Sequence, residues 1–463
     1  MSGVYRRMIT SLTTVCLAVC LHQNVLSQEE DQPAEREPAI EAVNMENLSP
    51  EGRDYSRRPN IVLIMTDQQF GGAMSCTGNP WLKTPAMDSL AARGMRFDRA
   101  YCGQPLCVPS RAAMMSGRYP HETRVEKNMG EEENVWDFQR WPIVANVLAQ
   151  AGYDCNYNGK WHLPYPREAV AQHGFGKDRT FFRAKRNRPF FHVESYLNPH
   201  DICEWARGQH KPTHAAPPPP DQCPPLPDNF AIPAEEPSVV REYLRQSSKK
   251  LGTDLHTPDR WRQYLWVYYR LVESVDREIG RFLYSLRARG NDENTIIIFT
   301  SDHGDGMGSH QINQKWLLYE EEIRVPLIIT CSEGAGRVDA KHLVSTGWDL
   351  MPTICDWAGV TPPCGLSGRS LRPLVEQSPP ADWRDQLVVE TTVSGGIGGR
   401  VLHTGRHKYI VYAKGENREQ LFDLEKDPGE MRSVAGEELV RHRALLPQWA
   451  KQTGDTAALK FIP

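Results

Sequence analysis

Hydrophobic residues gather in short runs that predict buried strands. Residues 60–66 and 295–300 are apolar almost throughout and rich in β-branched side chains, a pattern typical of strands covered on both faces of a parallel sheet. Residues 190–197 form a third strand candidate. Over residues 258–290 the apolar side chains recur at helical spacing with charged residues between them, which predicts a long amphipathic helix. Strands alternating with helices indicate an α/β fold.

Two shorter helices are predicted by the residues at their ends. A Pro near the start and a Gly at the end mark residues 84–94 and residues 142–152. Residues 211–237 are rich in Pro and include a run of consecutive prolines, which is incompatible with regular structure and predicts an irregular surface loop. Such a loop could wall a binding pocket or simply be solvated.

After about residue 383 the pattern changes to short alternating segments, which end in a closing helix. These segments are residues 401–403, 409–412 and 420–424, and they predict a small antiparallel sheet. We therefore expect a doubly wound, mostly parallel sheet in a main domain, residues 58–382, and an antiparallel-sheet subdomain, residues 383–463.

The first 27 residues have the features of a secretory signal. Arg6 and Arg7 precede a short apolar run, and Ser27 ends a suitable cleavage site. The run is too short for a stable membrane span, so an uncleaved anchor and a lipoprotein attached through Cys20 are the weaker alternatives. Residues 28–57 are acidic and polar without apolar periodicity, which predicts a disordered linker. We therefore expect export, to the periplasm or out of the cell.

The composition narrows the range of partners. The chain has 463 residues and a formal net charge of -4 at pH 7, so nothing points to nucleic acid as a partner. Its 11 cysteines include no Cys-x-x-Cys metal motif. Cys203 with Cys223, and Cys355 with Cys364, could form local disulfides in an oxidising compartment, but buried free thiols fit the sequence equally well.

One cysteine stands in an unusual run. Residues 107–111 read Cys-Val-Pro-Ser-Arg, and Gly117 follows at the distance of a helix end. Pro109 suits the first position of a helix, so Cys107 is expected at or just before the helix N-terminus. Free backbone N–H groups and the helix dipole favour an anion there, and the planar guanidinium of Arg111 suits sulfate or phosphate. A buried or disulfide-bonded cysteine before an ordinary helix is the alternative.

Polar residues follow directly after two of the predicted strands. Asp67 and Gln68 come after the first strand, and Asp302 and His303 come after residues 295–300. Ligands of open α/β sheets bind beyond the carboxyl ends of the strands, so these side chains are expected to meet. Their oxygen atoms suit calcium or magnesium, while the imidazole leaves manganese or another transition metal open.

A cation and an imidazole follow residue 159. In an extended conformation Lys160 and His162 would lie on one face, because side chains alternate along a strand. An ammonium group could hold an oxygen of an anionic ester, and an imidazole could move a proton.

The run Cys-x-Pro-Ser-Arg, followed by Ala-x-x-x-Ser-Gly-Arg-Tyr at residues 112–119, resembles the signature of the formylglycine-dependent sulfatases, which have an alkaline phosphatase-like fold. The resemblance implies that a modifying enzyme converts Cys107 to an aldehyde. One hydroxyl of the hydrated aldehyde would attack sulfur and the second would expel the product. The segments around Lys160, His200 and Lys315 and the C-terminal Leu-Phe-Asp-Leu-x-x-Asp-Pro-x-Glu are also similar to the family.

The resemblance also implies roles for these residues. Cys107 would be the nucleophile and, through its modified oxygen, a ligand of one divalent cation. Arg111, Lys160 and Lys315 would stabilise the sulfate oxygens. His162 or His200 would protonate the departing alcohol. The expected activity is that of an arylsulfatase-like sulfuric ester hydrolase, with sulfated carbohydrates as the expected substrates.

The metal pairs depart from the commonest family pattern, which has two adjacent acids after the first strand and Asp-Asn after the later one. Gln68 and His303 instead resemble the branch that includes choline sulfatases and phosphonate monoester hydrolases. A phosphonate or phosphate ester hydrolase on the same scaffold is therefore one alternative. A protein that binds sulfated glycans without modifying Cys107 or turning them over is the other.

Overall fold

In the computed structural model, the two apolar runs are neighbouring parallel strands, β1 (Asn60–Asp67) and β6 (Thr295–Ser301). The structure describes residues 58–462 apart from residues 131, 132, 134, 179, 184, 185, 212, 331–335 and 394. The signal and linker expected at residues 1–27 and 28–57 lie outside the described residues. Every described residue belongs to one unit, residues 50–463.

The main sheet is mostly parallel, as the sequence predicts. Its strands in the described chain follow the order β4-β5-β1-β6-β7-β2-β8. The first four of them run parallel, whereas β7 runs antiparallel to both of its neighbours. The other strands of this sheet are β4 (Asp154–Gly159), β5 (Phe190–Pro199), β7 (Leu327–Thr330), β2 (Gly94–Phe97) and β8 (Arg337–Asp339).

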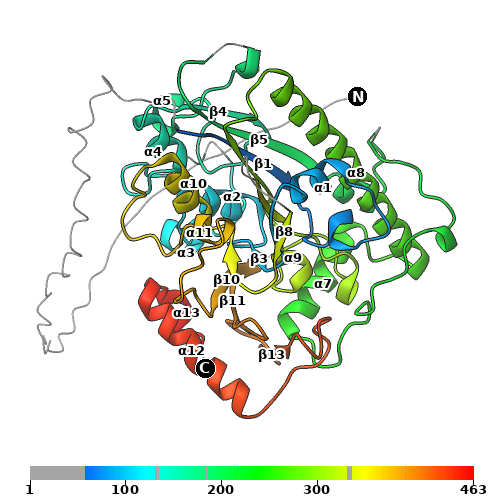
Figure 1. Ribbon diagram of the computed structural model, residues 1–463. Helices are drawn as coiled ribbons and strands as arrows, with labels where there is room; N and C mark the ends of the chain where they lie inside the picture. The colour runs from blue at the N-terminus through cyan, green and yellow to red at the C-terminus, as the bar shows by residue number, and fades with distance from the viewer. Residues whose placement is uncertain are drawn as a thin grey trace, which may run out of the picture. The chain divides into compact units, whose positions relative to one another are not determined.

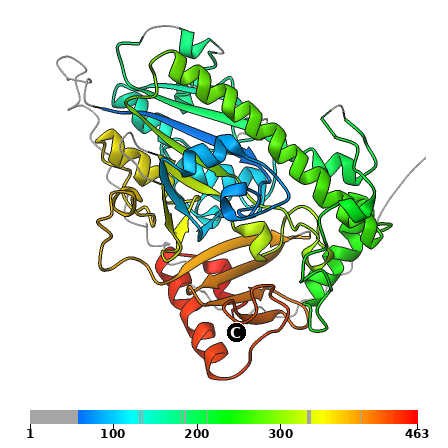
Figure 2. The same ribbon diagram turned by 45° about the vertical axis from the view of Figure 1, so that its right-hand side comes forward.

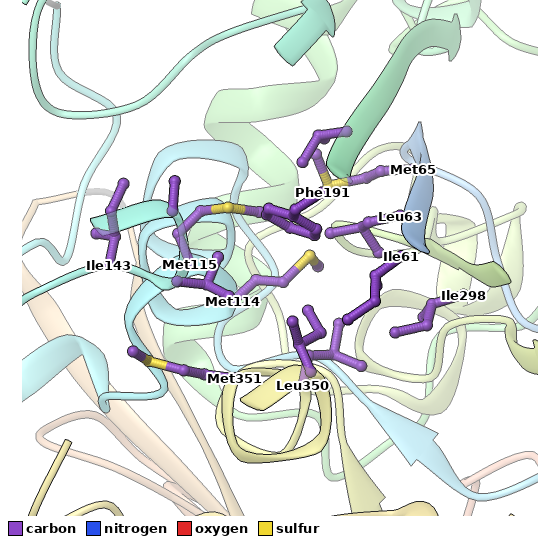
Figure 3. Close-up of a cluster of buried hydrophobic side chains, with 14 of the residues drawn as sticks. Ile61, Leu63, Met65, Met114, Met115, Ile143, Phe191, Ile298, Leu350 and Met351 are labelled. Carbon is purple, nitrogen blue, oxygen red and sulfur yellow. The ribbon is translucent and has the colours of Figure 1, made fainter. Parts of the chain in front are cut away.

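Helices cover both faces of this sheet (Figure 1). Alternate residues of β1 point to opposite faces, so Ile61, Leu63 and Met65 enter one apolar core (Figure 3) and Val62 and Ile64 enter the other. The first core packs against α2 (Cys107–Ser116), α4 (Val144–Gln150) and α10 (Leu350–Ala358), and the second packs against α1 (Pro85–Ala91), α6 (Ile202–Ala206) and α8 (Pro258–Ala288). Each fully buried aliphatic side chain contributes roughly 1.5–3 kcal/mol.

The remaining elements of the described chain are short or lie outside the main sheet. The helices are α3 (Pro120–Thr123), α5 (Val170–His173), α7 (Ser238–Leu251), α9 (Glu320–Ile323), α11 (Arg372–Val375), α12 (Glu437–Thr453) and α13 (Thr456–Leu459). The 3-10 turns are η3 (Ser75–Thr77), η5 (Phe181–Arg183), η6 (Pro220–Gln222) and η7 (Ser309–Gln311), and a two-stranded sheet joins β3 (Ala100–Tyr101) to β9 (Val344–Ser345).

The predicted C-terminal sheet is present. Its four described strands lie in the order β10-β11-β12-β13 and are antiparallel throughout. Their bounds are β10 (Leu387–Val393), β11 (Ile397–His403), β12 (His407–Tyr412) and β13 (Glu419–Asp423). Figure 2 shows the closing helix α12 beside this sheet. The domain boundary expected near residue 382 stays a prediction.

The structure corrects one helix end. The helix predicted at residues 84–94 ends at Ala91, and Gly94 begins strand β2. A Cβ atom on Gly94 would lie 2.4 Å from the carbonyl oxygen of Ile329. This glycine therefore permits close pairing with β7 and does not end the helix.

Neither of the two possible local disulfides is present in the described chain. Cys203, Cys223 and Cys355 are buried free thiols, which agrees with the alternative that the sequence left open, whereas Cys364 is an exposed free thiol. In residues 211–237 the regular structure described is the short turn η6. No helix in the described part of the chain is long and apolar enough to span a membrane.

Candidate active site

Cys107 is the first residue of helix α2, so Pro109 is the third residue of the helix and not, as the sequence predicts, the first. Leu106 is extended and Gly117 ends the helix in the left-handed conformation, as the sequence predicts. The backbone N–H of Val108 donates to the side-chain oxygen of Asn128 at 3.0 Å. Cys107 is only 1% exposed, so its sulfur lies at a buried helix N-terminus, where the helix dipole favours negative charge.

Three cationic or imidazole side chains face the sulfur of Cys107. Lys315 Nζ lies 3.0 Å from Sγ, His303 Nε2 lies 3.3 Å away and Lys160 Nζ lies 3.9 Å away. Burial and the carboxylate of Asp67 oppose ionisation of the thiol, but these three groups outweigh them. They hold the pKa of Cys107 well below its usual range. The site is therefore built to hold negative charge at position 107.

Two buried carboxylates lie at the ends of β1 and β6, bridged by one guanidinium. Arg111 donates from Nη2 to Asp67 Oδ2 and from Nε to Asp302 Oδ2, both at 2.8 Å. Lys160 Nζ also contacts Asp67 Oδ2, at 2.5 Å. Burial raises the pKa of Asp67, but Lys160, His200 and Arg111 outweigh it and the pKa is lowered well below its usual value. Burial and the neighbouring Asp67 raise the pKa of Asp302.

Arg111 also donates from Nη1. Its Nη1 donates to the Ser195 hydroxyl and to the carbonyl oxygen of Lys160, both at 3.0 Å. Sequence reasoning expected Arg111 to face the substrate and gave no signal for Ser195, which lies within strand β5. In the structure Arg111 instead ties together the carboxylates and the segment that carries Lys160.

The donor set fits a divalent cation. Single ligand atoms of Asp67, Cys107, Asp302 and His303 all lie within 4.8 Å of one another, and all four residues are buried. Asp67 Oδ1 is buried and has no hydrogen-bond partner in the described chain, so it is free to bind a cation. His303 Nδ1 contacts the carbonyl oxygen of Gly304 at 2.9 Å. That bond makes Nδ1 the donor and leaves the Nε2 lone pair for a ligand.

Gln68 joins this cluster through both ends of its amide. Its Oε1 accepts from Lys315 Nζ at 2.9 Å, and its Nε2 donates to Asp305 Oδ2 at 2.7 Å. Sequence reasoning missed Asp305. The one available signal was its position two residues after His303 in the same turn. Burial raises the pKa of Asp305. The hydrogen bonds that the carboxylate accepts lower the pKa but do not outweigh burial.

The predicted extended conformation of residues 160–162 is wrong. Strand β4 ends at Gly159, and His162 has a φ of 46°, so Lys160 and His162 do not share a strand face. A Cβ atom on Gly159 would lie 1.8 Å from the carbonyl oxygen of Ser195, so the chain turns where only glycine fits. Lys160 still reaches the cluster. The described contacts do not join His162 to Cys107, and His162 Nδ1 is buried without a described partner.

His200 follows strand β5 and lies close enough to act on the cluster. Burial, together with the positive charge of Lys315, lowers the pKa of His200 to about 3. The negative charges of Asp67 and Cys107 oppose this shift but do not outweigh it. The structure therefore brings together Cys107 and the predicted side chains from five other places in the chain: residues 67–68, 111, 160, 302–303 and 315.

Two protein-family models match most of the chain. A family model described as "Sulfatase" matches residues 59–184 and 177–360, and one described as "N-sulphoglucosamine sulphohydrolase, C-terminal" matches residues 308–448. The chain belongs to the sulfatase family. It is therefore a sulfuric ester hydrolase of the alkaline phosphatase-like fold. Family membership disfavours the alternative of a non-catalytic glycan-binding protein.

Individual relatives and solved structures that are similar to the chain include sulfatases. This sulfatase is 29% identical over 443 residues to a Δ4,5-hexuronate-2-O-sulfatase of Bacteroides thetaiotaomicron, covering 86% of this chain and 90% of the relative. It is 26% identical over 534 residues to an N-acetylglucosamine-6-O-sulfatase of the same species, covering 94% and 93%. A solved 2-O GAG sulfatase matches with a TM-score of 0.78 and 26% identity, covering 87% of this chain and 94% of that chain.

A phosphonate monoester hydrolase of Agrobacterium radiobacter is also similar. Its TM-score is 0.65 at 23% identity, and the match covers 87% of this chain and 96% of that chain. At that identity the likeness shows a shared fold and carries no information about the substrate.

Proposed function

We propose that this sulfatase removes sulfate from a sulfated carbohydrate, with residue 107 as the nucleophile and a divalent cation beside it. One observation carries the proposal. The sulfur of Cys107 lies 3.0 Å from Lys315 Nζ and 3.9 Å from Lys160 Nζ, next to a carboxylate oxygen of Asp67 that has no partner in the described chain. Such a site can hold an anionic ester and a cation together.

The residues of the chain divide the work. Lys315 and Lys160 hold the sulfate oxygens and stabilise the charge that develops on them. Arg111 keeps the Asp67 and Asp302 carboxylates in place, and so acts on the reaction through them. His200 is neutral before substrate binds, because its pKa is lowered to about 3. It hydrogen-bonds the departing oxygen and delivers a proton once the negative charge of the bound ester has raised that pKa. His162, with a buried Nδ1 that has no described partner, is the second candidate for that step.

A divalent cation and a formylglycine at position 107 would complete the site. Asp67, Gln68, Asp302 and His303, with residue 107, would hold one divalent cation, and calcium suits this mainly oxygen ligand set best, ahead of magnesium and manganese. A cation would neutralise sulfate charge, and a formylglycine at position 107 would supply an oxygen nucleophile and a second hydroxyl for product release. A formylglycine-generating or equivalent enzyme would be needed as a partner.

The substrate class follows from the relatives. Curated relatives include the two Bacteroides sulfatases described above and a ulvan-active sulfatase of Formosa agariphila, which is 27% identical over 424 residues. A solved structure with 25% identity and a TM-score of 0.69 is a complex of the protein with its substrate, D-glucosamine-2-N,6-O-disulfate. We infer a sulfated saccharide as the substrate here. Export to the periplasm or the medium, guided by the first 27 residues, would bring the enzyme to such polymers.

Sulfate release from a panel of substrates tests this proposal. The full chain, made together with a formylglycine-generating enzyme, is incubated with sulfated monosaccharides, with unsaturated disaccharides from sulfated glycosaminoglycans and ulvan, and with phosphonate monoesters. Ion chromatography then measures free sulfate. We expect release from at least one saccharide and none from a Cys107→Ala variant. Turnover of phosphonate monoesters in preference to every sulfate ester would favour the phosphonate hydrolase alternative and contradict the proposal.

A further inference from the structure

A buried carboxylate that belongs neither to the cation ligands nor to the groups around Cys107 lies directly behind Gln68. Asp305 is fully buried and accepts a hydrogen bond from Gln68 Nε2 at 2.7 Å. We propose that Asp305 is a positioning residue, which fixes the Gln68 amide so that its oxygen, and not its nitrogen, faces the cation and Lys315. This inference rests on the proposed function, in which Gln68 is a ligand.

A glutamine at this place needs such a partner for a simple reason. The amide has an oxygen end and a nitrogen end of almost the same shape, and only the oxygen can bind a cation or accept from an ammonium group. A carboxylate ligand has two oxygens and works in either orientation. A glutamine at position 68, in place of a carboxylate, can therefore point its amide nitrogen at the cation. A neighbouring residue has to exclude that orientation.

The contacts around Gln68 define a single orientation. Lys315 donates to Oε1 at 2.9 Å, and Asp305 Oδ2 accepts from Nε2 at 2.7 Å. Turning the amide around would set Nε2 against the Lys315 ammonium, donor against donor, and Oε1 against the Asp305 carboxylate, acceptor against acceptor. Because Lys315 is expected to turn to the sulfate oxygens during the reaction, Asp305 is the partner that holds the amide throughout.

Asp305 is itself held in place from the opposite side. The Tyr264 hydroxyl of helix α8 lies 3.0 Å from Oδ1 and 2.9 Å from Oδ2, and the Met307 N–H donates to Oδ1 at 2.9 Å. Tyr264 is fully buried. The donors that converge on this carboxylate suit a group that only accepts hydrogen bonds. A chain of contacts thus runs from the long helix α8 through Asp305 and Gln68 to Lys315 and Cys107.

An Asp305→Asn variant tests the proposal with little change in volume. Both carboxylate oxygens of Asp305 accept from a donor, but an asparagine has only one oxygen. Its NH₂ group therefore lies either against Gln68 Nε2 or against the Met307 N–H. The first arrangement favours the reversed Gln68 amide. We expect Ca²⁺ affinity, measured by calorimetry on the chelator-treated full chain without substrate, to fall about 10–100-fold, the usual range for a lost partner of a metal ligand.

A double variant separates positioning from plain structural damage. In Gln68→Glu with Asp305→Asn, the glutamate has no wrong end and accepts from the asparagine NH₂, so Ca²⁺ affinity should return to within about threefold of wild type. Asp276→Asn is the matched control, because Asp276 is also a buried carboxylate but accepts from the backbone N–H groups of Ala86 and Met87, away from the Gln68 amide. We expect its Ca²⁺ affinity to stay within about threefold of wild type. Thermal unfolding of each variant confirms that the chain is folded.

The outcomes are distinguishable. A wild-type chain that binds none of Ca²⁺, Mg²⁺ and Mn²⁺ contradicts the cation site of the proposed function and, with it, this inference. A wild-type chain that binds Ca²⁺ while Asp305→Asn binds it equally well overturns this inference alone. Weak binding by Asp305→Asn that the double variant does not restore, with unchanged thermal stability in both, also overturns it.

Discussion

Replacing Lys315 by methionine removes one ammonium group from the site while keeping most of the side-chain volume. Lys315 Nζ lies 3.0 Å from Cys107 Sγ and 2.9 Å from Gln68 Oε1, and the residue is 5% exposed. Burial opposes its charge, but the neighbouring Cys107 and Asp67 outweigh burial and raise the pKa of Lys315. The side chain is therefore an ammonium group at neutral pH, held in place before the substrate arrives.

The size of the effect follows from this geometry. A preorganised donor in a site without bulk water stabilises developing oxygen charge, and removing one costs about 2.7–4 kcal/mol, or roughly 10²–10³ in kcat. Lys160 Nζ lies farther from Sγ, at 3.9 Å, is already bound to Asp67 at 2.5 Å, and its side chain is 15% exposed. We therefore expect the loss for Lys160→Met to be smaller than the loss for Lys315→Met.

Steady-state kinetics on the saccharide that the wild-type enzyme hydrolyses fastest provides the assay. Lys83→Met, at an exposed lysine, controls for the loss of a positive charge and should leave kcat unchanged. The expected result is a large fall in kcat with a smaller change in KM. A folded Lys315→Met variant with kcat within about threefold of wild type would refute the oxyanion role, because one such contact is worth far more.

Three further predictions concern charge pairs and the cation. Arg111→Gln breaks the buried contacts with Asp67 and Asp302, so thermal or urea unfolding should show a loss of about 3–5 kcal/mol, the usual cost of an uncompensated buried charge; an unchanged midpoint would contradict the bridging role. The Glu390 carboxylate contacts His121 Nδ1 at 2.5 Å and, against burial, raises the pKa of His121 to about 9. Because this pKa lies above that of the unfolded chain, the stabilisation by protonated His121 is complete below about pH 6.5 and is lost as the pH rises toward 9. The Tm difference between wild type and His121→Gln should therefore shrink over that range. A difference that stays constant would be evidence against a charged pair between His121 and Glu390. Treatment with EGTA should abolish sulfate release and lower Tm, and added Ca²⁺ should restore both; full activity without any cation would exclude the cation site.

Local sequence signals predict the parts of the molecule that depend on local physics. The structure agrees with the predictions for the apolar strands β1 and β6, for the helix ends around Cys107 and Gly117, and for the C-terminal strands. In each case the residues of the segment itself determine its burial and its backbone conformation. The motif residues Asp67, Lys160 and Lys315 meet because the carboxyl ends of parallel strands share one edge of the sheet.

Other features depend on contacts between distant segments. Arg111 reaches Asp67, 44 residues away, and Asp302, 191 residues away, so its bridging role is invisible in the motif itself. Asp305 becomes significant only once Gln68 lies against it. The error at His162 has the same origin, since the left-handed turn after β4 is set by how closely Gly159 approaches the backbone of β5.

The chemical state of residue 107 is the most direct test of the central claim. Trypsin should release residues 100–111, which contain both Cys102 and Cys107. Cys102 thus serves as an internal reference. With protein from the native host, or from a host that supplies the modifying enzyme, tandem mass spectrometry should locate an aldehyde at residue 107 and an unmodified thiol at Cys102. Two unmodified thiols under those conditions would contradict the proposed nucleophile.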